Sequence, residues 1–314
     1  ENVTYRKVVV SMFRSMTVIN DRNESLTISL ADPRESGYLI SGIDGLGPTK
    51  ATLWHSESVT SDGSVFNGAR KESRDITITL AYLWDANHSI EELRHRIYRY
   101  FPEKRAVTLI FETDTRRVKT VGHVENNDVA IFTSQEASAI TIRCADPWFE
   151  DASEVSEIVT QFSTVESRFE FPFPIAGDTF EFGNISIDHS KIVQYDGEAE
   201  VGVIITVELT GPVSNPSFYN EDWDESILIY TDKVKSIIGS DLQSGDQIII
   251  STVSGEKYAR IRREGIDYNV LNAIDRAVSW ITLYPGNNVI TYMAESGIDN
   301  MMVSVSSKIL YAGV

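Results

Sequence analysis

The sequence has almost no cysteine and no long hydrophobic run. Cys144 is the only cysteine among 314 residues, which excludes an intramolecular disulfide framework and a zinc site built from several thiolates. The longest apolar runs, such as 108–112 and 247–252, are strand-sized and far short of the ~20 residues that cross a bilayer as a helix. We therefore expect a fold that is stabilised by its hydrophobic core alone, with no membrane partner.

The sequence also lacks the patterns of the common catalytic and cofactor sites. No pair of its five histidines has the i, i+4 spacing of a helical zinc site, no Gly-x-Ser-x-Gly occurs, and residues 42–50 do not match a phosphate-binding loop. Residues 220–226 begin like a calcium loop, but Glu225 stands where that loop needs glycine and Thr231 where it needs glutamate. We predict no enzyme, no metal site and no cofactor.

Cys144 raises the question of a nucleophile. A catalytic cysteine needs a base, commonly histidine, and an electropositive setting, whereas the nearest charged neighbours here are Arg143 and Asp146. Residues 138–144 alternate like a strand. We therefore interpret Cys144 as the buried or half-buried last residue of that strand.

Negative charge is concentrated in the second half of the chain. Residues 1–150 carry 18 Lys and Arg against 21 Asp and Glu, a net charge of −3, and residues 151–314 carry 10 against 25, a net charge of −15. Such asymmetry suggests two units with different surroundings. An acidic surface repels phosphate backbones, so we expect no nucleic-acid partner.

Alternating apolar residues predict a mainly β chain. In the first half, strands are predicted at 25–30, 75–83, 106–112, 116–125 and 138–144. Residues 150–190, with two prolines among aromatic positions, read as a linker or edge segment. Further strands are predicted at 200–210, 246–264, 280–295 and 301–307, with turn signals between them. That spacing indicates a β-sandwich in the second half.

One segment of the first half, residues 89–102, predicts a helix instead. Ser89 and Glu92 have the spacing of a capping box, and Ile90, Leu93 and Ile97 recur at helical spacing. Pro102 blocks continuation of the helix.

Two ordered sets of motifs resemble a known family. The first set is Ile43-Asp44-Gly45-Leu46-Gly47, then Asp62-Gly63-Ser64, Phe66, Gly68 and Arg74. The second is the order IRCADPWF, YDGEAEVGVIITVELTGPVSNPSFYN, LQSGDQIIISTVSGEKYARIRREGIDYN and SWITLYPGNNVITYMAES. Nearly the whole chain is similar to the distal tail protein (Dit) family of long, flexible-tailed bacteriophages.

The resemblance implies a β-rich ring-forming hub domain at 1–147, with its helix near 89–101, and a galectin-like or carbohydrate-module-like β-sandwich at 148–314. It implies a structural virion protein, made in the host cytoplasm, that forms a homohexameric ring at the distal end of the tail. The ring would join the tail tube protein to the tail-associated tip protein, with a receptor-binding protein or the tape measure as further partners. It implies no catalytic site.

Three groups of residues follow as candidates. Those expected at the ring interface are Asp62, Gly63, Phe66, Arg70 and Arg74, although the same segment also reads as an ordinary solvated hairpin. Pro147, Trp148 and Phe149 are expected at the junction between the domains. An alternative function is recognition of host cell-wall glycans through Trp223 and Tyr219, and a cell-wall hydrolase with a carboxylate pair stays open as a third.

Overall fold

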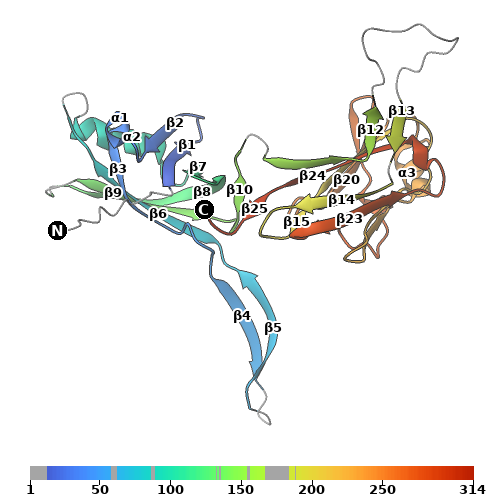
Figure 1. The fold of residues 1–314 in the computed structure, drawn as a ribbon, viewed down its shortest axis with the longest axis horizontal. Coiled ribbons are helices and arrows are strands. Elements are labelled where there is room, and N and C mark those ends of the chain that lie inside the picture. The colour runs from blue at the N-terminus through green and yellow to red at the C-terminus, as the bar shows by residue number, and fades with distance from the viewer. Residues whose placement is uncertain are drawn as a thin grey trace, which may run out of the picture. The chain divides into compact units, whose positions relative to one another are not determined.

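The computed structural model describes residues 13–57, 62–85, 89–131, 133, 136–153, 156–166, 184–187 and 189–314. The chain divides into two compact units (Figure 1): the first comprises residues 1–156 with 310–314, and the second comprises 157–309. The sequence placed the boundary between 147 and 148, and it did not anticipate that the last five residues belong to the first unit.

A nine-stranded antiparallel sheet forms the first unit. Its main path runs β2-β1-β7-β8-β9-β6-β3, and β10 pairs with both β8 and β25. The strands are β1 (Phe13–Ile19), β2 (Ser25–Ser29), β3 (Tyr38–Asp44), β6 (Arg74–Tyr82), β7 (Ala106–Thr113), β8 (Arg117–Ala130), β9 (Ala137–Cys144), β10 (Phe149–Asp151) and β25 (Leu310–Tyr311). The five strands that alternation predicts in this half are confirmed, because one face of each carries the buried aliphatic residues.

Helix α2 (Ile90–Tyr100) covers one face of this sheet, and a short helix, α1 (Pro33–Ser36), precedes β3. The predicted capping box is present, since the Ser89 hydroxyl accepts the Glu92 N–H and the Glu92 carboxylate accepts the Ser89 N–H. Leu93 and Ile97 are buried in the core cluster, and the Tyr38 hydroxyl donates to the Leu93 carbonyl at 2.8 Å. The helix is therefore fixed both by its own cap and by the sheet.

The outer face of α2 holds an ion pair whose effect on stability depends on pH. Glu24 accepts hydrogen bonds from the Arg99 guanidinium and then from Asn20, which together lower its pKa from 4.5 to about 2. A lowered folded-state pKa means that the stabilisation is fully present above about pH 4.5 and is lost as the pH falls toward 2. We expect NMR titration to show Arg99→Gln returning the Glu24 pKa toward 4.5.

The control for this prediction is Arg105→Gln. Arg105 is also exposed and forms an ion pair with Asp21 at 3.8 Å, so its removal should leave the Glu24 titration unchanged. An equal shift in both variants would contradict a specific role for Arg99.

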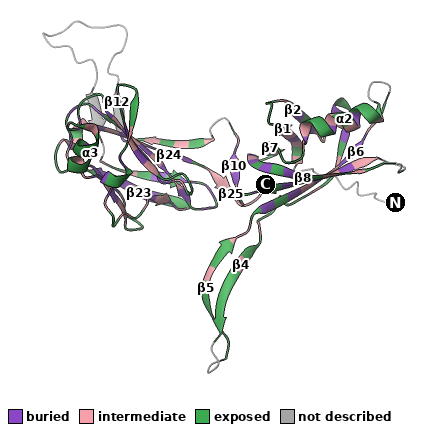
Figure 2. Cartoon of the chain, turned by 180° about the vertical axis from the view of Figure 1, so that it is seen from behind, coloured by how far each residue is buried: buried purple, intermediate pink, exposed green. Residues whose placement is uncertain are grey.

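A long hairpin, which we call the arm, leaves the first unit between β3 and β6 (Figure 1). It consists of β4 (Ala51–Glu57) and β5 (Ser64–Lys71), which pair only with each other. Nearly all of its residues are exposed on both faces (Figure 2). A bulge between Trp54 and His55 places Asn67 between the paired positions, next to Gly68.

The second unit contains a six-stranded sheet, β11-β24-β16-β19-β20-β21, and a four-stranded sheet, β14-β23-β17-β18. The strands of the first sheet are β11 (Glu157–Gln161), β16 (Ile204–Leu209), β19 (Gln247–Ser251), β20 (Tyr258–Arg263), β21 (Ile266–Asn269) and β24 (Met301–Lys308); those of the second are β14 (Ser190–Tyr195), β17 (Ser217–Asn220), β18 (Glu225–Leu228) and β23 (Gly286–Met293). Two small pairs complete it, β12 (Ser163–Glu166) with β13 (Asn184–Ile187) and β15 (Val201–Gly202) with β22 (Thr282–Leu283). Phe162, after β11, packs edge-on against Tyr292 of β23 and so joins the two larger sheets.

Three short helical segments lie among these strands: α3 (Thr231–Ile238), η1 (Leu271–Ala273) and η2 (Ile298–Asn300). The mainly β fold that the sequence predicts is confirmed. Within the predicted linker or edge segment at 150–190, β11 is an edge strand and β12 pairs with β13; the stretch 169–177, with its two prolines, lies outside the described residues. Among the described residues, no helix has the length and hydrophobicity of a membrane span.

Candidate interaction sites

The arm exposes large apolar side chains that its own unit does not cover. Leu53, Trp54, Val65 and Phe66 are 56%, 47%, 67% and 58% exposed. The Phe66 ring contacts the opposing His55 ring at a centroid distance of 5.7 Å. Four large apolar side chains are thus exposed on one short hairpin. Whether they form an interaction surface stays a prediction.

The arm also carries three other predicted interface residues. Asp62 and Gly63 lie at its outer end and are exposed; Gly63 has a φ of 91°, as the turn requires. Arg70 lies near the base of β5 and is exposed. The structure therefore brings Asp62, Gly63, Phe66 and Arg70 onto one element, at different distances along it.

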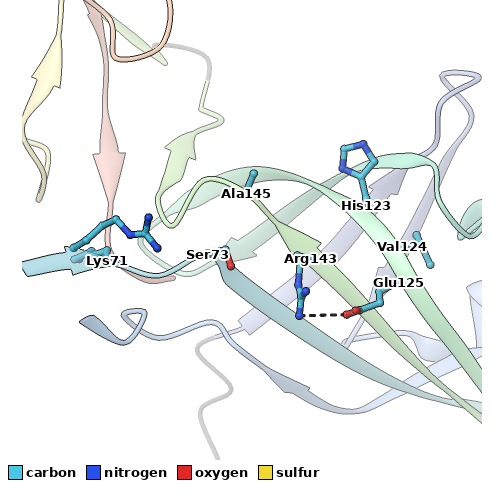
Figure 3. A pocket seen from close by; sticks show the side chains of 8 residues that line it. Lys71, Ser73, His123, Val124, Glu125, Arg143 and Ala145 are labelled. Carbon is cyan, nitrogen blue, oxygen red and sulfur yellow. Dashed lines mark ion pairs between the residues drawn. The ribbon is translucent and has the colours of Figure 1, made fainter. Parts of the chain in front are cut away.

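A hollow of about 700 Å³ lies at the base of the arm (Figure 3). Its lining comes from the end of the arm and from β8 and β9: Arg70, Lys71, Ser73, His123, Val124, Glu125, Arg143 and Ala145. Arg143 forms ion pairs with Asp75 at 3.0 Å and Glu125 at 3.7 Å, and the Lys71 ammonium lies 3.6 Å from the Trp148 ring centroid. Sequence reasoning missed this hollow because its lining joins segments that are far apart in the chain.

Arg74 is placed differently from the other predicted interface residues. Its side chain is 1% exposed, so it lies inside the first unit and is not available to a partner. The guanidinium donates to the carbonyls of Gly45, Gly47 (2.6 Å), Pro147 (2.7 and 3.1 Å) and Ala312 (2.7 Å). Burial lowers the pKa of this guanidinium from its usual value. Arg74 thus joins three distant segments, including the C-terminal one, by binding their carbonyls.

The residues predicted at the domain junction lie around this guanidinium. Phe149 is fully buried in the core of the first unit, with the Arg74 guanidinium carbon 4.1 Å from its ring centroid. Pro147 and Trp148 are half-buried, and Pro147 contributes a carbonyl acceptor. Gly45 has a φ of 89°, and a Cβ there would lie 2.1 Å from the Asp75 carbonyl oxygen, so only glycine fits at this turn. The junction role of these residues stays a prediction.

Cys144 is the last residue of β9 and is fully buried, as the sequence predicts. A Cβ on Gly122 of the neighbouring strand would lie 2.7 Å from its sulfur, so the thiol occupies space that a glycine leaves open. Desolvation raises the pKa of the thiol, which keeps it protonated. This setting is opposite to that of a catalytic cysteine.

We expect Cys144 to resist thiol reagents in the folded protein. A maleimide at pH 8 should label less than a tenth of the chains without denaturant and nearly all of them in guanidinium chloride, because only unfolding exposes the sulfur. Mass spectrometry measures the labelled fraction. A Ser64→Cys, Cys144→Ala variant, which carries its thiol on the exposed arm, is the control and should react rapidly; rapid native labelling of Cys144 itself would contradict its burial.

The carboxylates of 220–226 are used within the second unit. The Thr291 hydroxyl donates to Glu221 at 2.6 Å, the Val289 N–H to Asp222 at 2.7 Å, and the Thr282 N–H to Glu225 at 2.7 Å. These bonds fix the loop to β22 and β23. Within the described part of the chain, no group of three or more metal-ligating side chains could hold an ion.

Trp223 and Tyr219, the predicted glycan contacts, do not share one surface feature. Trp223 follows β17, is 52% exposed and stacks on Tyr284 with ring centroids 3.9 Å apart. Tyr219 lies within β17, opposite Ser226 and Thr291, and is half-buried. The exposed aromatic platform is therefore Trp223 with Tyr284, a pair that sequence spacing does not indicate.

The chain is mainly β and consists of two units, each built from antiparallel sheets. No family model matches the sequence, and no curated protein matches it. Among solved structures, the chain is similar to the crystal structure of the SPP1 Dit (gp 19.1) protein, described as a paradigm of the hub adsorption apparatus in phages that infect Gram-positive bacteria. The TM-score is 0.61 at 12% identity, covering 94% of this chain and 98% of that chain.

Two structures of the phage P2 baseplate in its activated conformation, with Ca and with Sr, give TM-scores of 0.44 and 0.43. Each is 11% identical and covers 94% of this chain and 97% of that chain. The chain has the fold of a distal tail protein, so the resemblance found in the sequence is confirmed at the level of the fold.

Proposed function

We propose that this chain is a structural distal tail protein that forms a homohexameric ring and acts as the baseplate hub of a phage tail. The observation that carries the proposal is the unpartnered apolar arm on a chain with the fold of the SPP1 hub protein. A ring needs a heterologous contact, in which different surfaces of neighbouring copies meet. An arm that extends from its own sheet supplies one such surface.

The hollow at the base of the arm is a suitable counterpart. Its lining holds Arg70 and Lys71, besides an Arg143 that is already paired with Asp75 and Glu125, while Glu57 and Asp62 are exposed near the outer end of the arm. The outer end of one arm can therefore pack against the base of the next with complementary charge. The net charge of −3 over residues 1–150 opposes ring closure far less than the −15 of residues 151–314 would.

In this function the ring joins the tail tube protein on one side to the tail-associated tip protein on the other, with a receptor-binding protein or the tape measure as further contacts. The protein would be made in the host cytoplasm and reside at the distal end of the virion tail, without catalytic activity. These partners rest on the resemblance and the fold.

Light scattering and negative-stain imaging test the ring. We expect a mass near six times 35.2 kDa and closed rings with six-fold symmetry. A monomer at all concentrations, with no ring when the tail tube and tip proteins are added, would overturn the proposal.

A second candidate function is recognition of host cell-wall glycans. It is favoured by the exposed Trp223 and its stack on Tyr284, since a flat aromatic platform is a surface on which a sugar ring packs. Calorimetric titration with host cell-wall polysaccharide tests it. Binding that is lost in Trp223→Ala would support this function, and no heat across a broad panel would remove it.

A further inference from the structure

Three cations of the second unit are not paired with carboxylates, although the unit is strongly acidic. Residues 157–309 hold 10 Lys and Arg against 23 Asp and Glu. Ion pairs with aspartates are formed, among others, by Lys235, Arg260, Arg262 and Arg263. Lys233, Lys257 and Arg276 form no such pair within the described residues.

Two of these cations line one hollow of about 380 Å³, and the third lies near a residue of its lining. The lining residues are Lys233, Leu271, Asn272, Ile274, Asp275, Arg276, Val278 and Trp280. The Lys257 ammonium lies 5.2 Å from the Trp280 ring centroid. The hollow thus combines an aromatic ring, three aliphatic side chains, one amide, two cations and one carboxylate, which is the mixture typical of small-molecule sites.

Most of the hollow is lined by residues 271–280, a segment that backbone hydrogen bonds hold in place. The Asp275 N–H donates to the Leu228 carbonyl at 2.9 Å and the Ser279 N–H to the Ser226 carbonyl at 3.1 Å, so the segment is bound to edge strand β18. The Tyr230 N–H donates to the Ala273 carbonyl at 2.9 Å, which ties the same segment to the start of α3. A ligand would therefore bind a largely preformed site.

We propose that this hollow binds an anionic saccharide unit, a sugar ring that carries a phosphate or a carboxylate. Trp280 offers the surface for the apolar face of the ring, Lys233 and Arg276 offer charged hydrogen bonds to the anion, and the Asp275 carboxylate accepts from a sugar hydroxyl. An acidic peptide segment without hydroxyls would leave Asp275 facing a like charge. A nucleic acid would meet the net charge of −13 of the whole unit.

Calorimetry on the full chain tests the site, with glucose 6-phosphate, glucuronate and glucose as probes at one ionic strength. We expect one or both anionic sugars to bind and glucose to bind at least about tenfold more weakly, because it lacks the charged contacts. Comparison of the two anions separates a phosphate site from a carboxylate site. The absence of binding by both anions at millimolar concentration would overturn the proposal.

The variants are chosen so that folding is preserved. Lys233→Gln with Arg276→Gln changes two exposed side chains that line the hollow and should weaken binding about tenfold or more. Lys235→Gln, on α3 but paired with Asp241 at 2.9 Å, and Trp223→Ala, at the other aromatic platform, are the matched controls and should bind as the unchanged chain does. Unaltered binding in the double variant would overturn the proposal of this site. This outcome does not depend on whether the chain forms a ring.

Discussion

Replacing Arg74 by methionine should destabilise the first unit by about 3–5 kcal/mol, since a buried acceptor left without its donor costs about 1–3 kcal/mol and such costs do not simply add over neighbouring carbonyls. Methionine fills much of the same volume but leaves the carbonyls of Gly45, Gly47, Pro147 and Ala312 without their donor. Arg74→Lys keeps the charge but loses the planar fork that reaches several acceptors, so it should recover only part of the loss. Unfolding in guanidinium chloride measures the loss of stability in each of the two variants. Hydrogen exchange of the β10 and β25 amides shows whether the loss falls on the segments that Arg74 joins.

Arg143→Ala is the matched control for Arg74. Arg143 lies opposite Asp75 in the same pair of strands, yet its side chain is 56% exposed and its partners are carboxylates at the surface. Exposed ion pairs contribute about 0–1 kcal/mol, so this variant should unfold almost as the original chain does. Equal losses for Arg74 and Arg143 would show that the buried carbonyl contacts are not what stabilises the unit.

Replacing both Trp54 and Phe66 by serine should reduce the assembly to monomers. This prediction rests on the proposed ring. Truncating the large aromatic residues at the centre of an interface commonly costs about 2–4 kcal/mol of binding free energy each. The combined loss is larger than the margin of association free energy that keeps a ring closed at micromolar concentration. Light scattering should show the mass falling toward 35.2 kDa.

The control is Trp84→Ser, because Trp84 is 70% exposed on the first unit but lies outside the arm. It should leave the mass of the assembly unchanged. Since Trp54 and Phe66 pack little within their own chain, circular dichroism and the unfolding midpoint should also stay unchanged in the double variant. A full-size assembly in the double variant would contradict the role of the arm.

Local signals explain why one helix was predicted and another was missed. The helix at 90–100 has its cap, its apolar positions and its terminating proline within one short segment. Helix α3 begins after Tyr230, which provides no side-chain cap; instead the Asn215 side chain accepts the Thr231 N–H at 3.0 Å. A cap supplied from so far along the chain leaves no local pattern for sequence reasoning to find.

The same limit applies to the sites. The alternation of β9 and the absence of a nearby base were enough to place Cys144 in the core. The sequence could not predict that Arg74 is buried, because its acceptors at Gly45, Pro147 and Ala312 come together only in the folded unit. The hollow lined by Trp280 was missed for the same reason.

The pairing of β10 with β25 makes the second unit an insertion in the first. Glu150 lies opposite Leu310 in an antiparallel register, so the chain leaves and re-enters the first unit at neighbouring positions. A two-residue turn joining Asp151 to Ile309 would close these strands as an ordinary hairpin. Excision of the second unit would then leave the order of every remaining strand intact, and a different module could be exchanged at the same point. A domain carried in this way can diversify or be replaced without redesign of the sheet that holds it.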